Sequence, residues 1–194
     1  MSGAAEGLGE LPASADLVVD RTWDGAPLAA EERATVRFEL AGGAVVVRVD
    51  APFHGDPAPP GPPGPTPRLW EHEVVELFVA GPGDDASVPY LELELSPHGH
   101  HLALRLEGVR RVVEEGLPVD VRTEIRGGRW RGEARLPLAW LPPAPRRAAA
   151  FAAHGAGPGR RHLASVPVPG PRPDFHRPDR FPPLRLGDAS GPAG

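Results

Sequence analysis

The stretch HEVVE, residues 72–76, differs at one position from the H-E-x-x-H signature of zinc peptidases. In that signature two histidines lie one helical turn apart and bind the metal, while the glutamate between them acts as a general base. Here Glu76 replaces the second histidine. A carboxylate can also ligate zinc, so the chemistry depends on whether this segment forms a helix.

The residues of this segment favour a strand. The sequence EVVELFVA, residues 73–80, is rich in the β-branched and aromatic side chains that fit strands. Positions four apart on a strand are separated by about 13 Å, at roughly 3.3 Å per residue, which is too far for one ion. Glu73 and Glu76 would also point to opposite faces, so they cannot flank one bond as a glycosidase pair. We therefore expect no zinc-peptidase site here.

The cluster HGHH contains His98, His100 and His101, a second candidate for metal binding. Pro97 and Gly99 interrupt it between two strand-like segments, so we interpret it as a hairpin turn. The chain has no cysteine, which excludes thiolate ligands, disulfides and a cysteine nucleophile. It also lacks the G-x-S-x-G, phosphate-loop and dinucleotide-binding motifs. We therefore expect neither catalysis nor a definite cofactor.

The composition limits the partners of this protein. The chain has 194 residues, which suits one domain with a sizeable core, and a formal net charge of −5. No basic field is available to attract nucleic acid or anionic lipid. No segment is long enough to span a membrane, and the N-terminal residues lack the cationic start and apolar run of a signal peptide. We expect a soluble cytoplasmic protein, whose oligomeric state stays open.

Short strand-like segments separated by glycine or proline dominate the chain. In YLELELS, residues 90–96, the three leucines face one way and the tyrosine and two glutamates face the other. Trp130 and Trp140 lie in or beside a similar segment and are predicted to pack in the core. Many short strands without a long amphipathic helix predict an all-β fold, a single antiparallel β-sandwich. The strand-like segments are ATVRFEL, AVVVRVDA, VVELFVA, YLELELS, LALRLEG, VRRVVEE, VDVRTEIRG and WRGEARLP.

Other segments connect or flank these strands. The Pro-rich residues 51–68 are predicted to form a long crossing loop, which serves either as an extended spacer or as a rim that lifts Trp70 toward one end of the sandwich. Beyond residue 145, PDFHRPDRFPPLRL and the two segments before it are interpreted as strands broken by turns. Residues 1–14 and 187–194 are predicted to be flexible tails around a sandwich of residues 15–186.

Four segments, taken in order, resemble the family 9 carbohydrate-binding modules and the related DOMON-like domains. They are LWEHEVVELFVA, YLELELSPHGHHLALRLEG, RWRGEARLPLAWLP and PDFHRPDRFPPLRL. The family pattern has a Trp, an acidic pair and a Val-Glu-x-Phe strand, then an aromatic strand ending in a Pro-Gly turn, a Trp-rich strand and an aromatic tail. The resemblance covers roughly residues 34–186. It implies an immunoglobulin-like β-sandwich that binds the ends of sugar chains between two aromatic side chains.

The resemblance also implies which residues bind the sugar. The first aromatic side chain corresponds to Trp70, the glutamate of the Val-Glu pair to Glu76 and the second aromatic side chain to Phe175. A polar residue on a late strand corresponds to His154. Glu94 stands where the family has an arginine, a departure that leaves the sugar specificity open.

The wider family brings two cofactors into consideration. Some DOMON domains hold haem through histidine and methionine, but the only methionine of this chain is the initiator. Modules of this family often carry structural calcium, and Asp84, Asp85 and Glu73 lie near candidate loop positions. Their spacing matches no recognisable calcium loop. The resemblance therefore implies structural calcium, but the sequence does not identify its ligands.

The residues themselves are consistent with sugar recognition. The apolar face of a pyranose packs on an aromatic ring, and its hydroxyls need oriented hydrogen-bond partners. Glu76, Arg105 and His154 could supply these bonds, and Arg105 is predicted to be the cross-strand partner of Glu76. Trp70 and Glu76 can contact one ligand only if the strand starts near Val74 and Trp70 folds back.

Three hypotheses about function follow. The first is a non-catalytic carbohydrate-binding module, and the second is a cytosolic scaffold or partner-binding sandwich that has lost the sugar site. The third is an unrecognised or glycosidase-associated hydrolase. Sugar binding predicts that Trp70 and Phe175 face each other across an open cleft, whereas a scaffold predicts that at least one of them is buried. A hydrolase needs two convergent titrating groups in that cleft.

Overall fold

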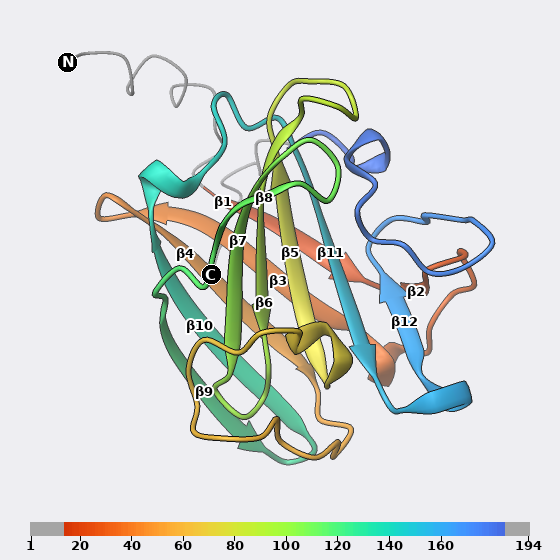
Figure 1. Cartoon of the computed structure of the whole chain (residues 1–194). Helices are drawn as coiled ribbons and strands as arrows, with labels where there is room; N and C mark the ends of the chain where they lie inside the picture. Colours follow the sequence, from red (N-terminus) through yellow and green to blue (C-terminus); the bar gives the residue numbers. More distant parts are fainter. Residues whose placement is uncertain (1–13, 185–194) are drawn as a thin grey trace, which may run out of the picture.

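Two antiparallel β-sheets form the part of the chain that the computed structural model describes, residues 14–184 (Figure 1). The five-stranded sheet has the order β1 (Ser14–Val19), β3 (Ala34–Ala41), β4 (Ala44–Pro52), β10 (Arg129–Pro137) and β9 (Asp120–Arg126). The seven-stranded sheet has the order β2 (Arg21–Thr22), β12 (Arg161–Ala164), β11 (Arg147–His154), β5 (Val74–Ala80), β6 (Pro89–Leu95), β7 (His101–Glu107) and β8 (Val112–Glu115). The predicted all-β sandwich is therefore confirmed.

The space between the sheets holds the main hydrophobic core. In Figure 1 the five-stranded sheet lies behind the seven-stranded sheet, and its strands cross diagonally. Period-two alternation directs the three leucines of β6 into this space, as predicted. Trp130 is only 1% exposed there, while Trp140 packs partly buried against the same cluster. Each fully buried large apolar side chain contributes about 1.5–3 kcal/mol to folding, so this layer holds the two sheets together.

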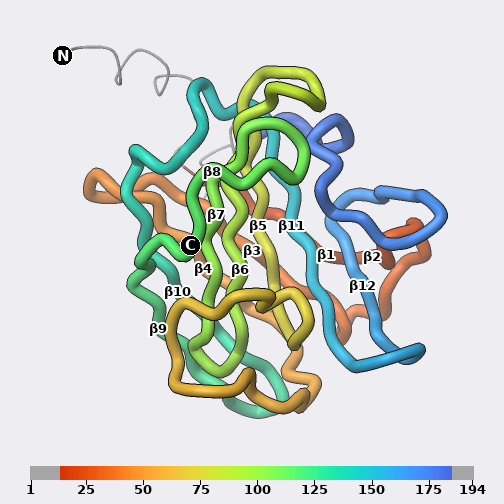
Figure 2. Tube along the Cα trace, in the orientation of Figure 1, coloured from red at the N-terminus to blue at the C-terminus, as the bar shows by residue number. Residues whose placement is uncertain are grey.

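A second apolar layer covers the outer face of the seven-stranded sheet. It includes Phe78, Phe151 and Leu104 from the strands and Phe181 from the C-terminal segment, which we define as residues 165–184. This segment, blue in Figure 2, passes close to β11 and β12. The predicted strands of PDFHRPDRFPPLRL are wrong within the described residues, because this stretch contains only a 3-10 turn, η5 (Pro178–Arg180), and one isolated bridge. Its prolines lack the N–H groups that a sheet needs.

The HEVVE stretch enters strand β5, which begins at Val74. Residues just before it form a 3-10 turn, η2 (Leu69–Glu71), that carries Trp70. Arg68 precedes this turn with a left-handed backbone (φ 59°), which reverses the chain direction. The strand prediction is confirmed, and the start of β5 at Val74 meets one of the two conditions for Trp70 and Glu76 to contact one ligand.

The Pro-rich loop crosses one end of the sandwich, as predicted, and is seen in ochre in Figure 1. It starts later than residue 51, because β4 continues to Pro52. Asp56 Oδ2 accepts a hydrogen bond of 2.5 Å from the Gly155 amide, which ties the loop to the end of β11. Thr66 Oγ1 lies 2.7 Å from His100 Nδ1. The HGHH cluster turns between β6 and β7, which confirms the hairpin.

Several smaller features complete the described residues. The sequence patterns indicated neither β1 nor β2. Three further 3-10 turns are η1 (Ala30–Glu32), η3 (Leu138–Trp140) and η4 (Gly157–Gly159). The predicted tails, residues 1–14 and 187–194, lie outside the described residues except for Ser14. Between residues 14 and 184, no helix combines the length and apolar character needed to cross a membrane.

Candidate functional site

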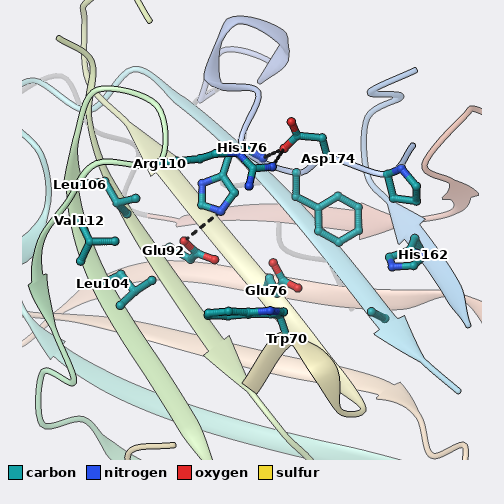
Figure 3. Close-up of a pocket in the computed structure, with 13 residues that line it drawn as sticks. Trp70, Glu76, Glu92, Leu104, Leu106, Arg110, Val112, His162, Asp174 and His176 are labelled. Carbon is teal, nitrogen blue, oxygen red and sulfur yellow. Dashed lines mark hydrogen bonds and ion pairs between the residues drawn. The ribbon is translucent and has the colours of Figure 1, made fainter. Parts of the chain in front are cut away.

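A pocket of about 330 Å³ lies on the outer face of the seven-stranded sheet (Figure 3). The sheet contributes residues of β5, β6, β7, β8, β11 and β12, and η2 and the C-terminal segment contribute side walls. Its lining residues are Trp70, Glu76, Glu92, Leu104, Leu106, Arg110, Val112, Ala153, His162, Pro173, Asp174, Phe175 and His176. The pocket therefore combines apolar walls with a small group of charged and titratable side chains.

Two aromatic rings from distant parts of the chain border this pocket. Trp70 on η2 is 45% exposed, which is unusual for so large an apolar side chain. Phe175 is partly buried, and its ring stacks on that of Phe151 with a centroid distance of 4.3 Å and an interplanar angle of 14°. The structure thus brings two of the predicted site residues, Trp70 and Phe175, to one pocket. Neither ring is fully buried, contrary to the expectation of the scaffold hypothesis.

The position of Trp70 is held by Arg160, which follows η4. The Arg160 guanidinium donates hydrogen bonds to the backbone carbonyls of Trp70, Glu71 and His72, the last at 2.9 Å. It also donates to the Gly155 carbonyl at 2.7 Å. One cation therefore satisfies the exposed carbonyls at the end of a short 3-10 turn, which have no partners within the turn itself.

Three glutamates lie side by side on the outer face of β5 and β6. Glu76 on β5 is the direct cross-strand partner of Glu94 on β6, and Glu92 lies two residues from Glu94 on the same face. All three are at most 3% exposed. Like charges directly opposite each other destabilise a sheet, and buried carboxylates are costly without donors. These residues are therefore expected to retain protons in the folded protein.

Burial changes the titration of this cluster. It raises the pKa of Glu76 well above its usual range, and the negative charge of Glu92 raises it further. The pKa of Glu94 is also raised well above its usual range, first by burial and then by the charges of both neighbours. Burial raises the pKa of Glu92 to about 7, although a hydrogen bond from protonated Glu94 opposes this rise.

His176 faces Glu92 from the C-terminal segment. Figure 3 shows the two side chains pointing toward each other, with His176 Nε2 3.8 Å from Glu92 Oε2. His176 Nδ1 lies 2.8 Å from the Tyr90 hydroxyl, which also accepts a 2.8 Å hydrogen bond from the Arg110 amide. Burial lowers the pKa of His176 to about 4. The ring is therefore neutral at pH 7 and has a single N–H group. When the Tyr90 hydroxyl donates to Nδ1, that N–H group is at Nε2 and points toward Glu92.

The two arginines near the carboxylates are engaged elsewhere. Arg110 Nη2 donates a 2.6 Å hydrogen bond to Asp174 Oδ1 at the rim of the pocket. Arg160 uses its donors on backbone carbonyls, as described above. Among the described residues, neither oxygen of Glu94 nor Oε2 of Glu92 accepts a hydrogen bond from an N–H or hydroxyl group. The floor of the pocket therefore has more acceptors than donors.

Arg105 and His154 lie away from this pocket. The cross-strand partner of Arg105 on β6 is Leu91, which points into the main core, so Arg105 and Glu76 are on opposite faces of the sheet. Arg105 forms an ion pair with Glu114 instead, and the expected contact with Glu76 is wrong. The ring of His154 stacks on that of His54 with a centroid distance of 3.4 Å.

His154 follows Ala153 on β11, and Ala153 lines the pocket. Alternation therefore directs His154 to the other face of the sheet. Glu94 lies directly beneath the site without contributing to its wall, while Trp70, Glu76 and Phe175 line the pocket as the family pattern implied. Of six predicted site residues, three line the pocket, one lies beneath it and two lie elsewhere.

Sequence reasoning missed Glu92 and His176. The alternation of YLELELS already places Glu92 on the same face as Glu94, so a signal for Glu92 was present. The register between β5 and β6, which brings Glu76 to the same cluster, is a property of the fold. His176 follows Phe175 directly, but only the path of the C-terminal segment brings it over Glu92.

The described residues offer no ready-made metal centre. Between residues 14 and 184, no three or more His, Cys, Asp or Glu side chains converge as metal ligands. Two of the calcium candidates bond to the chain itself: Asp84 Oδ1 accepts from the Ala86 amide at 3.1 Å, and Glu73 accepts from the His54 amide at 2.8 Å. Calcium binding stays a prediction that this arrangement does not support.

Comparisons with known proteins give a family and a fold. No protein-family model matches the chain. It is 39% identical over 184 residues to the UPF0462 protein C4orf33 homolog of Mus musculus, covering 91% of this chain and 94% of that protein. It is 40% identical over 169 residues to the UPF0462 protein C4orf33 of Homo sapiens, covering 83% of each.

A solved structure shares this architecture. A "putative carbohydrate-binding protein" from Bacteroides uniformis superposes with a TM-score of 0.65 at 17% sequence identity, covering 86% of this chain and 84% of that one. The likeness shows that the two proteins share a fold, the antiparallel β-sandwich described above.

Proposed function

The chain belongs to the UPF0462 family, and from its pocket we propose that it binds a carbohydrate without catalysing a reaction. The observation that carries this proposal is the meeting of Trp70, Phe175 and two buried glutamates, Glu76 and Glu92, in one pocket. Its volume of about 330 Å³ is at the lower end of small-molecule sites, which suits one or two sugar rings at a chain end.

Each part of the pocket has a counterpart on a pyranose. The C–H face of the sugar ring packs on the exposed Trp70 indole, while Phe175 borders the same space. Sugar hydroxyls exchange hydrogen bonds with the carboxyl groups of Glu76 and Glu92, and these bonds fix the orientation of the sugar ring. A hydroxyl that donates to Oε2 of Glu92 also reduces the cost of burying that atom, which accepts no hydrogen bond from the described residues.

The related structure supports this proposal at the level of the fold alone. The Bacteroides uniformis protein is named for carbohydrate binding, and it shares the sandwich. Folds of this kind host many functions, so the proposal rests on the side chains of the pocket.

One observation favours a hydrolase as the second candidate. Glu76 and Glu92 both line the pocket, and the pKa of each is raised by burial, as expected for a general acid. A glycosidase, however, places its two carboxyl groups on either side of the scissile bond. Here both project from neighbouring strands of one sheet and meet a bound sugar from the same side. Binding is therefore the better-supported function.

The test is a calorimetric titration of the purified protein with mono- and oligosaccharides, repeated with Trp70→Ala. We expect saturable binding to some sugars that is lost in the folded variant. Arg105→Ala is the matched control, because Arg105 lies on the opposite face of the sheet and should leave binding intact. Binding that survives Trp70→Ala unchanged contradicts this site. Reducing ends released from the oligosaccharides during the titration would favour the hydrolase.

A further inference from the structure

The floor of the pocket has a surplus of carboxylates over cations. Glu76 and Glu92 line the pocket and Glu94 lies beside both, and each is at most 3% exposed. Oε2 of Glu92 is buried and points toward His176, which lines the same pocket. This atom accepts no hydrogen bond from the described residues. A buried carboxylate without a donor is destabilising, so this arrangement is expected to be completed by a ligand.

No arginine of the described residues forms an ion pair with this cluster, although the charge of Arg160 lowers the pKa of Glu76 and that of Arg110 lowers the pKa of Glu92, both against the larger effect of burial. The sequence has no lysine, so arginine is the only side chain that is always positively charged at pH 7. The nearby Arg110 is paired with Asp174, and Arg160 is bonded to backbone carbonyls. His176 is neutral at pH 7 because burial lowers its pKa to about 4. A cation in direct contact with these carboxyls is therefore expected to arrive with the ligand.

We propose that the ligand is an amino sugar with a free, protonated amine, and that its ammonium group lies between Glu76 and Glu92. This inference rests on the proposed function, since it names the class of sugar that the same pocket takes. An ammonium group has three N–H donors and no acceptor, and its charge lowers the pKa of the carboxyls beside it, so that Glu76 and Glu92 ionise and accept as the amine binds. A neutral sugar offers one O–H donor for each hydroxyl and carries no charge that would ionise these carboxyls.

The aromatic wall favours the same class of ligand. Trp70 lines the pocket together with Glu76, and Figure 3 shows its indole lying beside that carboxylate. Cations are attracted to the face of an aromatic ring, most strongly to that of tryptophan. The indole thus accepts the C–H face of the sugar and adds attraction for its charged group. An N-acetylated sugar loses both the charge and two of the three donors, so it is expected to bind less tightly.

The experiment uses matched sets of sugars that differ at one group. Glucose, glucosamine and N-acetylglucosamine form one set, and the galactose and mannose series form two more, so that ring stereochemistry does not decide the result. Affinities are measured by calorimetry at pH 6.5 with the full-length protein. We expect the free amino sugar of at least one series to bind at least tenfold tighter than its neutral and N-acetylated partners.

Two variants locate the preference. Glu92→Gln and Glu76→Gln keep the shape of each side chain but remove its charge, and each is expected to reduce the ratio of amino-sugar to neutral-sugar affinity to threefold or less. Glu133→Gln is the matched control, because Glu133 lies on β10 in the other sheet, partly exposed and paired with Arg48, and should retain the full ratio.

The outcomes separate this inference from the proposed function. Equal affinity for glucose and glucosamine, repeated in the other series, overturns the amino-sugar inference and leaves sugar binding intact. Cyclohexylamine is a probe that carries the amine but no sugar hydroxyls. If it binds as tightly as the amino sugars, the site recognises an amine alone. Both the proposal of carbohydrate binding and that of an amino-sugar ligand are then wrong. An absence of binding by all nine sugars and by cyclohexylamine overturns both proposals together. A preference that persists in both glutamine variants also overturns the inference.

Discussion

Glu76 on β5 and Glu94 on β6 face each other directly across the antiparallel register, both buried on the outer face of the seven-stranded sheet. No ion pair of the described residues involves either of them, and the neighbouring Glu92 has only the neutral His176 ring 3.8 Å from its Oε2. A sheet that served only as a scaffold would be more stable with apolar residues at these positions. This pair, with Glu92 beside it, therefore supports the proposal that the ligand binds at the outer face.

Trp70→Ala is expected to reduce sugar affinity at least tenfold while changing the free energy of unfolding by less than about 1 kcal/mol. The stability change is small because the side chain is 45% exposed, so its replacement leaves no large cavity. Calorimetry measures the affinity and urea denaturation the stability. Trp70→Phe retains an aromatic surface and should keep part of the binding; a loss as large as that of the alanine variant would argue against stacking.

Phe175→Ala is expected to weaken both binding and folding. The ring lines the pocket but also stacks on Phe151, so its removal should lower the free energy of unfolding by about 1–3 kcal/mol. Phe175→Leu separates the two effects, because leucine fills the contact with Phe151 without offering an aromatic face. Denaturation and titration of both variants provide the comparison. Full sugar affinity in the leucine variant would assign Phe175 to packing alone.

Glu92→Gln is expected to stabilise the protein at high pH. The carboxyl has its ordinary pKa of 4.5 in the unfolded chain and about 7 in the folded protein, so the folded state holds the proton more tightly. Its contribution to the free energy of unfolding is therefore greatest below pH 4.5 and is lost as the pH rises to about 7. The variant should match the wild type near pH 4 and exceed it by up to about 3 kcal/mol near pH 8.

Denaturation curves across this pH range measure the effect of Glu92→Gln. The contribution of His176 to the free energy of unfolding changes with pH in the opposite direction, because its pKa is lowered to about 4 and the contribution is lost as the pH falls. His176 is present in both proteins, so its contribution cancels in the comparison. The difference between the two curves therefore isolates the carboxyl cluster. A difference that does not vary with pH would show that Glu92 is ionised in both the folded and unfolded states.

Arg160→Met is expected to loosen the turn that carries Trp70. Methionine keeps much of the apolar stem but removes the hydrogen bonds to the carbonyls of Trp70, Glu71 and His72. We expect faster amide exchange in residues 69–73 and a three- to tenfold loss of sugar affinity, since Arg160 positions the aromatic wall. Hydrogen exchange with mass spectrometry makes this measurement.

Arg161→Met is the control for this experiment, because Arg161 is adjacent in sequence but exposed and paired with Glu32. Unchanged exchange in residues 69–73 of the Arg160 variant would show that the turn holds its shape without the cation. Loss of affinity in the Arg161 variant would point to a general effect of charge.

Arg105→Ala is expected to leave sugar affinity within twofold of the wild type. The sequence pattern alone predicts the opposite, because it pairs Arg105 with Glu76. In the fold, Arg105 lies opposite Leu91 and is ion-paired to Glu114, away from the pocket. A large loss of affinity in a folded variant would show that the ligand extends beyond the pocket to the far face of β7.

The sequence by itself determined those features that depend on local chemistry. The β-branched run around HEVVE predicts a strand, and the alternation in YLELELS assigns its leucines to one face and its glutamates to the other. These two inferences succeed because strand preference and side-chain alternation act within a few residues of the chain. The choice of Trp70, Glu76 and Phe175, which line one pocket in the structure, came instead from the resemblance of four motifs to a known family.

Only the tertiary structure decided which faces and which strands meet. Alternation places Arg105 on the face of β7 opposite to that of its two chain neighbours. The register of β7 with β6 and of β6 with β5 then places Arg105 and Glu76 on opposite faces of the sheet. The β11 segment is mostly alanine, so its pattern carries no preference that would direct His154 to either face. The path of the C-terminal segment, whose prolines exclude strand pairing, brings His176 over Glu92. Cross-strand register and long-range packing depend on contacts between residues far apart in sequence, and these contacts built the pocket.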